Sequence, residues 1–375
     1  MIYASSAGTR DADEGYGRPV IRDEGMTDGY EAVFLRRAPL NPAVLDDQSF
    51  FAFRDLDIFR AIVTGRYDVL WLMGYAYLSL VLAAIAQIAT GRHVIFGENQ
   101  TLLDAGSRPY WRRLAKNLGL NVLLTRGVGL YSGTENYNWF RHYGVRPERL
   151  FLSPYCVDNA RLVETDLKLR PFKNELRSKL GIPSDSGPVV LCVSRLIPKK
   201  QPLFLLEAFK RARRQVRCSL LIVGSGELEG ELRAAIREQQ VSDVVLAGFM
   251  DQSQVGEAYV CADIFALPSA RYETWGVVIN EAMNFGLPIL ASDKVGSATD
   301  LVVHGKNGYV VSSRDPGDLA NRIVELVRSA TTRARFGEAS RRLVSAWGVD
   351  AAASGVLEAV AAVVGPEQWR AANGG

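Results

Sequence analysis

The sequence predicts an α/β protein of two doubly wound, Rossmann-like domains that face each other across a cleft. Its 375 residues fit two domains of ordinary size. Through the second half, apolar runs of strand length alternate with segments of helical periodicity. Those runs carry no polar face, as expected for a parallel sheet covered by helices on both sides. Because such sheets bind ligands beyond the carboxyl ends of their strands, we expect the functional residues in the loops that follow.

Three segments are expected along the chain. Residues 1–165 form an N-terminal domain and residues 166–348 a C-terminal domain. Residues 349–375 add a helix, Val349–Val364, that packs back on the N-terminal domain. The stretch SPYCVDNARLVETDLKLRPF is interpreted as the connection that crosses between the domains.

The C-terminal half has the clearest pattern of elements. Strands are expected at residues 188–194, 217–224, 243–249, 263–269, 287–292 and 307–312. Helices are expected at residues 201–215, 226–240, 254–262, 275–286 and 315–330. This regular alternation is the main reason for predicting a doubly wound sheet.

The N-terminal half is less regular, and one stretch imitates a membrane span. Residues 69–90 carry no charge and are long enough to cross a bilayer. The alternative divides the stretch at Gly74 into a buried strand, 68–73, and a buried helix, 78–89. We favour the strand and helix because the flanking residues continue the same alternation.

Composition excludes some classes of protein. Lys and Arg number 44 and Asp and Glu 41, so the formal net charge is +3, which argues against a nucleic-acid-binding protein. The four cysteines form no C-x-x-C pair, which favours buried, reduced thiols in a cytosolic protein. No basic segment followed by an apolar stretch stands at the start of the chain, so we expect no signal peptide.

No metal site is expected. Two acidic pairs, at residues 11–13 and 55–57, have D-x-D spacing, but no buried strand precedes either of them. The histidines are scattered along the chain, without the companions that a metal or a catalytic triad needs. They are His93, His142 and His304.

The strongest candidate site is RYETWGVVINEAMNFGLP, in which seven residues separate Glu273 from Glu281. Eight helical residues rise about 12 Å, which is comparable with the length of a nucleotide-diphosphate sugar. One carboxylate could hold sugar hydroxyls and the other ribose hydroxyls, with the N–H groups of Trp275, Gly276 and Val277 facing the phosphates. Taken alone, the spacing leaves open two solvated acids on an amphipathic helix.

Two further candidates lie in loops of the same half. In VSRLIPKKQP, Arg195 and Lys200 stand between a strand and a helix, where two cations suit a pyrophosphate. Lys199 is interpreted as a bystander, and a solvated basic loop is the alternative. In IVGSGELEGEL, Gly224 and Gly226 predict a tight turn without the spacing of the dinucleotide fingerprint.

Five segments of the C-terminal half, taken in order, resemble the retaining nucleotide-sugar glycosyltransferases of the GT-B fold known as family 4. They are VSRLIPKKQPLFLLEAF, LLIVGSGELEGEL, LAGFM, ALPSARYETWGVVINEAMNFGLPILAS and SDKVGSATDLVVHGKNGYVV. Five ordered matches are more specific than any one of them. The resemblance implies a metal-independent hexosyltransferase without a cofactor, whose C-terminal domain binds a nucleotide-diphosphate sugar and whose N-terminal domain binds the acceptor.

The resemblance also implies residue roles. Arg195 and Lys200 hold the donor diphosphate, while Glu273 contacts the transferred sugar and Glu281 the ribose. The other donor contacts that it implies are Gly224 in the glycine turn, Phe249 and Met250 along the base, and the backbone of Trp275, Gly276 and Val277 near the phosphates. The family usually has Gly after the second cation, where this chain has Gln201.

The N-terminal half resembles the acceptor domain of a bacterial subgroup more loosely. VIFGENQTL resembles a strand end whose acid, here Glu98, lies on the acceptor side. The chain starts near what should be the second strand, so we expect the N-terminal domain to lack its first strand. Met73 stands before Gly74, where relatives often carry His.

The expected partners are a nucleotide-sugar donor and an acceptor glycan, glycolipid or small molecule. The expected setting is the cytoplasm of a bacterium that makes glycans or natural products. Contact with the inner face of the membrane through Trp111, Arg112 and Arg113 stays open, beside the interpretation of an ordinary exposed helix face. A nucleotide-sugar epimerase and a non-catalytic nucleotide-sugar-binding subunit remain alternative functions.

Overall fold

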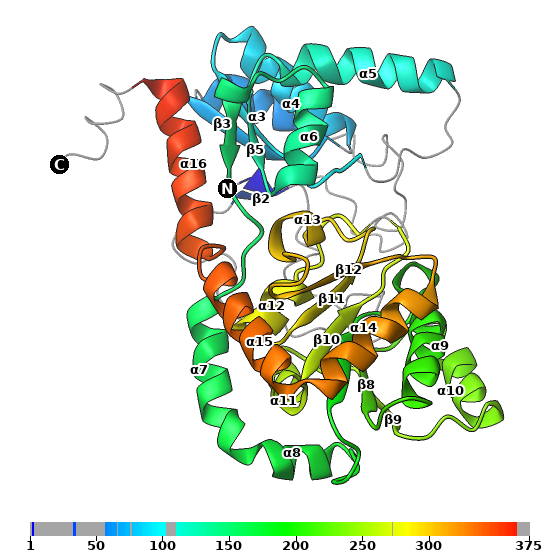
Figure 1. Ribbon diagram of the computed structural model, residues 1–375. Coiled ribbons are helices and arrows are strands. Elements are labelled where there is room, and N and C mark those ends of the chain that lie inside the picture. The colour runs from blue at the N-terminus through cyan, green and yellow to red at the C-terminus, as the bar shows by residue number, and fades with distance from the viewer. Residues whose placement is uncertain are drawn as a thin grey trace.

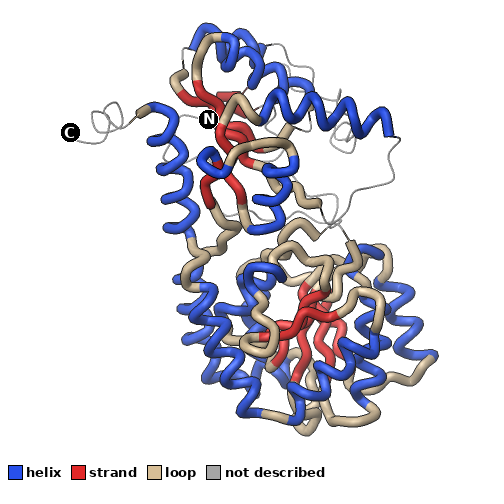
Figure 2. Tube along the Cα trace, turned by 45° about the horizontal axis from the view of Figure 1, so that its top comes forward, coloured by secondary structure: helices blue, strands red, loops and turns tan. Residues whose placement is uncertain are grey.

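The computed structural model describes residues 2–3, 33–34, 57–65, 67–75, 77–102, 110–271 and 273–365. Within these residues the chain forms two parallel sheets flanked by helices, and a further ladder of two very short strands (Figures 1 and 2). The two main sheets belong to the two halves of the chain. The predicted two-domain α/β architecture is therefore confirmed.

The C-terminal domain is built on a six-stranded parallel sheet of order β12-β11-β10-β7-β8-β9. The strands are β7 (Val189–Val193), β8 (Ser219–Val223), β9 (Val244–Gly248), β10 (Ile264–Leu267), β11 (Ile289–Ser292) and β12 (Gly308–Val311). Every residue of β8, β10 and β11 is buried, which explains their unbroken apolar sequences. The order reverses between β7 and β10, so this domain is doubly wound and has its switch point there.

Helices cover both faces of this sheet. One face packs against α9 (Pro202–Arg213), α10 (Glu229–Glu238) and α14 (Pro316–Arg328). The other packs against α8 (Lys173–Lys179), α11 (Val255–Cys261), α12 (Val278–Asn284) and α13 (Ala298–Leu301). Helix α15 (Ala330–Val344) contributes side chains to both faces, and the sequence pattern predicts neither α13 nor α15.

The N-terminal domain has a four-stranded parallel sheet in chain order. Its strands are β3 (Val69–Met73), β4 (His93–Gly97), β5 (Val128–Tyr131) and β6 (Leu150–Leu152). One face packs against α3 (Asp57–Gly65), α4 (Leu78–Ala89), α5 (Tyr110–Leu124) and α6 (Thr134–His142). Residues 69–90 thus form a strand and a helix, as we favoured, and not one membrane span.

Other predictions for the N-terminal domain fall on residues that the structure does not describe. The two short strands β1 (Ile2–Tyr3) and β2 (Val33–Phe34) pair in parallel, apart from the four-stranded sheet. The expected loss of the first strand concerns a region that lies mostly outside the described residues. Asp11, Asp13 and Asp55 of the two D-x-D pairs lie outside the described residues, as do the side chains of Trp111, Arg112 and Arg113, while Asp57 is the first residue of α3.

Helix α16 (Val349–Val364) covers the other face of the N-terminal sheet (Figure 1). A Cβ atom added to Gly355 would come within 1.8 Å of the carbonyl oxygen of Leu152, so the helix backbone lies directly against the end of β6. In the described part of the chain, one stretch, Ala330–Val364, is long and apolar enough in composition to cross a membrane. Because α16 packs on the N-terminal sheet, we interpret the apolar part of this stretch as a helix that covers the sheet and not as a membrane span.

The chain passes from the N-terminal to the C-terminal domain through helix α7 (Asn159–Leu169). This helix packs against α11 and α12 of the C-terminal domain. The predicted boundary between residues 165 and 166 falls inside it. The domain boundaries themselves stay a prediction.

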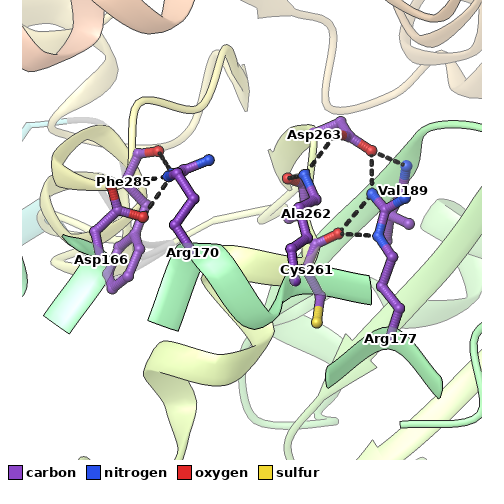
Figure 3. Close-up of polar contacts among 9 residues, drawn as sticks. Asp166, Arg170, Arg177, Val189, Cys261, Ala262, Asp263 and Phe285 are labelled. Atoms are coloured by element: carbon purple, nitrogen blue, oxygen red, sulfur yellow. Dashed lines mark hydrogen bonds and ion pairs between the residues drawn. The ribbon is translucent and has the colours of Figure 1, made fainter. Parts of the chain in front are cut away.

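An ion-pair cluster ties α8 to the amino ends of β7 and β10 (Figure 3). Lys173 Nζ and the Arg177 guanidinium donate to the Asp263 carboxylate, at 2.8 and 2.5 Å, and the N–H of Val189 donates to it at 2.8 Å. Arg177 also donates to the carbonyl of Cys261. Burial alone would raise the pKa of Asp263, but the two neighbouring cations and the Val189 N–H hold it below its ordinary value.

We expect Asp263→Asn to lower the free energy of unfolding at pH 7 by about 2 kcal/mol, because two half-buried cations lose their partner. Because the pKa of Asp263 is lower in the folded protein than in the unfolded chain, its charge stabilises the fold fully at pH values above 3.8. This stabilisation is lost as the pH falls from 3.8 through the pKa of the folded state. Urea unfolding at pH 7 and pH 3 measures both effects. If Asp263→Asn lowers the free energy of unfolding by the same amount at both pH values, the ion-pair explanation is contradicted. Asp185→Asn is the control, since it breaks only the exposed pair with Arg217.

Candidate functional site

The loops that follow β7, β8, β10 and β11 are bonded to one another through their main chains. They leave the carboxyl edge of the C-terminal sheet beside the switch point, where ligands bind in such folds. The N–H groups of Leu196, Ala270 and Gly296 donate to the carbonyl groups of Ser225 (2.8 Å), Lys199 (2.8 Å) and Glu273 (2.9 Å). The predicted site residues of this domain therefore lie on loops that support each other.

Gly224 is required by the close approach of two of these loops. A Cβ atom at this position would come within 1.9 Å of the carbonyl oxygen of Ser194, and φ is +138°, where side chains are rarely tolerated. Its N–H donates to the carbonyl of Gly248 at 2.8 Å. The tight turn predicted from the sequence is confirmed, and it holds the β8 loop against the loop that carries Arg195 and Lys200.

The structure brings the predicted cation Lys200 and the predicted acid Glu273 into direct contact. They form an ion pair in which the two side chains are only 14% and 10% exposed. Ser269 Oγ donates to the same carboxylate oxygen at 3.0 Å. Two groups from the loops after β7 and β10 are thus held together, and removing either one would leave a buried charge without its partner.

Gln201 adopts a backbone conformation that is typical of glycine. Its backbone is left-handed, with φ 52° and ψ 51°, a region that favours glycine. With its side-chain amide turned so that the nitrogen faces them, Gln201 donates to the carbonyl oxygens of Pro268 (2.8 Å) and Ser313 (3.2 Å), which follow β10 and β12. Gln201 thus forms a left-handed turn directly before α9, and its side chain contacts the loops after β10 and β12.

The helix predicted at residues 275–286 is shorter than expected. Helix α12 begins at Val278, so Glu273 lies outside it, and the expected rise along a continuous helix between the two acids is wrong. Glu273 instead pairs with Val295 in an isolated bridge, and Gly276 has φ +92°. No hydrogen bond from the N–H groups at residues 275–277 is present within the described part of the chain.

Glu281 lies in the first turn of α12 and is half-buried. The hydroxyl group of Tyr259, from α11, donates to its carboxylate at 2.6 Å. Burial raises the pKa of Glu281 above its ordinary value, although this hydrogen bond opposes the change. The carboxylate is thus fixed at the helix start, on the same segment as Glu273.

Trp275 is buried where the two domains meet. Its ring stacks on Tyr155 at 5.6 Å and lies 5.3 Å from the ring of Trp347, so it touches both segments that cross between the domains. Its Nε1 donates to Asn280 Oδ1 at 2.9 Å. The Trp275 side chain is therefore part of the domain interface, and the predicted role of its backbone in donor binding stays a prediction.

The remaining predicted donor residues lie on the same edge of the sheet. Arg195 is exposed on the β7 loop, five residues before Lys200. Phe249 and Met250 follow β9 directly and are half-buried. Met250 packs against the core on the α11 and α12 face.

Glu98 follows β4 in the N-terminal domain and is 8% exposed. Burial raises the pKa of Glu98 to about 7, although the N–H of Asn99 and the charge of Lys116 oppose this. Burial raises the pKa of Tyr155 to about 12, and the charge of Glu98 adds to this effect. Tyr155 stacks on Trp275, which lies on the segment that carries Glu273.

Among the described residues, no group of three or more His, Cys, Asp and Glu side chains could hold a metal ion. Cys192, Cys218 and Cys261 are buried and Cys156 is half-buried, and all four are free thiols.

Comparison with known proteins shows what this chain is similar to. Residues 172–343 match the model of the family "Glycosyl transferases group 1". Over 312 residues, the chain is 28% identical to a GDP-mannose-dependent alpha-(1-6)-phosphatidylinositol monomannoside mannosyltransferase of Mycobacterium tuberculosis, covering 80% of this chain and 77% of the relative. This match and this relative identify the chain as a glycosyltransferase. A D-inositol 3-phosphate glycosyltransferase of Pseudarthrobacter chlorophenolicus is 27% identical over 77% of this chain and 69% of its own length.

Solved structures show that this glycosyltransferase has the GT-B fold. Anabaena Alr3699/HepE in complex with UDP superimposes with a TM-score of 0.68, covering 88% of this chain and 86% of HepE at 21% identity. Sucrose-phosphate synthase from Thermosynechococcus elongatus gives a TM-score of 0.64 at 21% identity, covering 86% of this chain and 80% of the synthase.

Several side chains that hold the predicted residues of this glycosyltransferase were not predicted from the sequence. They are Ser269 beside Glu273, Tyr259 beside Glu281, and Tyr155, Asn280 and Trp347 around Trp275. Ser269 ends a predicted strand, which is a weak signal. Tyr259 looks like an ordinary core residue of a short helix, so its pairing could not be read from the pattern.

We expect Gly224→Ala to destabilise the C-terminal domain by about 2 kcal/mol, because the methyl group meets a carbonyl oxygen and the backbone is strained. Gly230→Ala is the matched control. Gly230 lies in α10 with nothing within 4 Å of an added Cβ, and alanine there stabilises the helix by up to about 1 kcal/mol. Thermal unfolding measures the melting temperatures of both variants. If Gly224→Ala melts at the same temperature as the wild type, the two loops can separate to admit a methyl group, which would contradict the required close approach.

Proposed function

We propose that this glycosyltransferase moves a hexose from a nucleotide-diphosphate donor to an acceptor hydroxyl with retention of anomeric configuration. The donor binds along the loops after β7, β8, β10 and β11, and the acceptor binds from the side of Glu98. The single observation that carries this proposal is the ion pair of Lys200 with Glu273, which joins the two predicted donor segments.

The proposed diphosphate site lies on the β7 loop. Lys200 and Arg195 supply two positive charges beside a turn, Gly224, that leaves room for no side chain. When the diphosphate binds, Lys200 exchanges part of its pairing with Glu273 for the phosphate oxygens. The negative charge that grows on the leaving diphosphate then meets cations that are already in place.

The proposed sugar and ribose contacts lie on the segment after β10. Glu273 accepts hydrogen bonds from hydroxyl groups of the transferred sugar, and Glu281 accepts them from the ribose. Ser269 and Tyr259 hold the two carboxylates in place from behind. The base lies against the backbone of Phe249 and Met250.

In the proposed reaction, the bond between the sugar anomeric carbon and the diphosphate oxygen breaks as the acceptor oxygen bonds to the same face of that carbon. The acceptor proton passes to an oxygen of the departing diphosphate. This chemistry requires no metal, no cofactor and no side-chain nucleophile. The facing domains exclude water, which limits hydrolysis of the donor.

Names of similar proteins guide the choice of substrates. One relative is named for GDP-mannose and a phosphatidylinositol mannoside, another for D-inositol 3-phosphate, and HepE was solved with UDP. We propose an acceptor that is a glycan, a glycolipid or a cyclitol, in bacterial glycan or natural-product biosynthesis, and an enzyme that works in the cytoplasm or against the inner face of the membrane. A thermal-shift screen of GDP-mannose, UDP-glucose and UDP-N-acetylglucosamine tests the donor, since binding raises the melting temperature.

We expect Lys200→Ala to lower turnover about 100-fold and to weaken nucleoside-diphosphate binding, because a charge that stabilises the leaving group is removed. Lys199→Ala is the matched control from the same turn, and we expect its kinetics to stay within about twofold. Steady-state kinetics and calorimetric titration measure these effects, with circular dichroism to check folding. If both variants behave alike, the diphosphate site is misplaced.

We expect transfer to rise as the pH increases through about 7, because the ionised Glu98 carboxylate accepts a stronger hydrogen bond from the acceptor hydroxyl. Glu98→Gln should remove this rise and weaken acceptor binding, while leaving donor binding unchanged. Initial rates between pH 5.5 and 8.5 measure the profile. A pH dependence that is identical in the variant would remove Glu98 from the acceptor site.

A further inference from the structure

A carboxylate of the C-terminal domain caps a helix of the N-terminal domain. Asp300, in α13, accepts hydrogen bonds from the N–H of Thr134 at 3.0 Å and from its hydroxyl group at 2.6 Å. Thr134 is the first residue of α6, where main-chain N–H groups lack partners and the helix dipole favours a negative charge. Beside this contact, Thr299 Oγ1 donates to the Glu135 carboxylate at 3.1 Å. Figure 1 shows α13 where the two domains meet.

Hydrogen bonds connect this contact to the acceptor side. The buried side chain of Asn136, in the first turn of α6, donates to the carbonyl of Gln100 at 2.8 Å. Its amide oxygen accepts from the N–H of Ser132, after β5, at 3.0 Å. Gln100 stands two residues after Glu98 on the loop that follows β4. The start of α6 and the loop of Glu98 therefore form one bonded unit.

A second set of hydrogen bonds connects the contact to the donor side. The N–H of Ser297, directly before α13, donates to the carbonyl of Trp275 at 3.0 Å. The N–H of Gly296 donates to the carbonyl of Glu273 at 2.9 Å. Asp300 thus stands one helical turn from a loop that is bonded to the Glu273 segment.

We infer that Asp300 is a positioning residue for sugar transfer, which sets the separation of the acceptor-side Glu98 and the donor-side Glu273 by capping α6. This inference rests on the proposed function, because it assumes that donor and acceptor meet between these two acids. Asp300 touches neither substrate. It acts through its contact with Thr134, which sets the distance between the acceptor side and the donor side of the site.

The atoms around the contact between Asp300 and Thr134 are closely packed. A Cβ atom at Gly133 would lie 2.3 Å from Trp275 Cζ3 and 2.7 Å from Asp300 Oδ2. The φ of Gly133 is 170°, an extended conformation that any residue adopts, so the glycine serves the close approach and not the backbone. An added methyl group at this position would push the two domains apart while keeping every hydrogen-bonding group.

The test compares Asp300→Ala and Gly133→Ala with the wild type. In both variants we expect transfer turnover to fall about 10- to 100-fold, as when reacting groups are misplaced by about 1 Å. We expect nucleoside-diphosphate affinity to stay within about twofold, and the fraction of donor lost to hydrolysis to rise. Asp300→Asn keeps an acceptor for the Thr134 N–H and should recover part of the turnover.

Asp315→Ala is the matched control, because Asp315 caps α14 by accepting from the N–H of Gly317 at 2.8 Å and makes this contact within one domain. It should lower stability without changing turnover or hydrolysis.

Small-angle scattering of the substrate-free proteins adds a measurement that needs no activity. We expect Asp300→Ala and Gly133→Ala to have a larger radius of gyration than the wild type. Unchanged scattering and unchanged turnover in both variants would overturn the inference. If the wild type binds no sugar nucleotide, the proposed function is refuted. The scattering comparison then still tests whether Asp300 and Gly133 set the distance between the domains.

Discussion

The buried ion pair of Lys200 with Glu273 is the contact on which the candidate site depends. It joins loops that are 73 residues apart in the chain and follow β7 and β10, the two neighbouring strands between which the sheet order reverses. Burying two charges is costly unless each compensates the other, so the pair holds only while both loops keep their places. Gly224 and Gln201 keep them there through a close approach and a left-handed turn.

The same edge of the sheet also controls how the domains meet. The segment from Glu273 to Glu281 carries both acids, and between them the Trp275 ring packs against Tyr155 and Trp347 at the two crossings. Changes that displace this segment would alter the ligand site and the interface together. This coupling explains why one short stretch of sequence carries the strongest functional signal and is also deeply buried.

The fold could largely be predicted from the sequence, because unbroken apolar runs identify the buried strands of a parallel sheet. The helices Leu78–Ala89 and Val349–Val364 form with their predicted bounds. The start of α12 could not be predicted, since the bridge of Glu273 with Val295 and the positive φ of Gly276 depend on a distant loop. For the same reason the pattern pointed to Glu273 and Lys200 as site residues but not to the partners Ser269, Tyr259 and Asp300, whose roles come from tertiary contacts.

A crystal structure of the protein with a saturating nucleoside diphosphate tests the central claim most directly. We expect diphosphate oxygens within hydrogen-bonding distance of Lys200 Nζ and the Arg195 guanidinium, with the ribose hydroxyls on the Glu281 carboxylate. A nucleotide bound elsewhere, with Lys200 still paired only with Glu273, would contradict it.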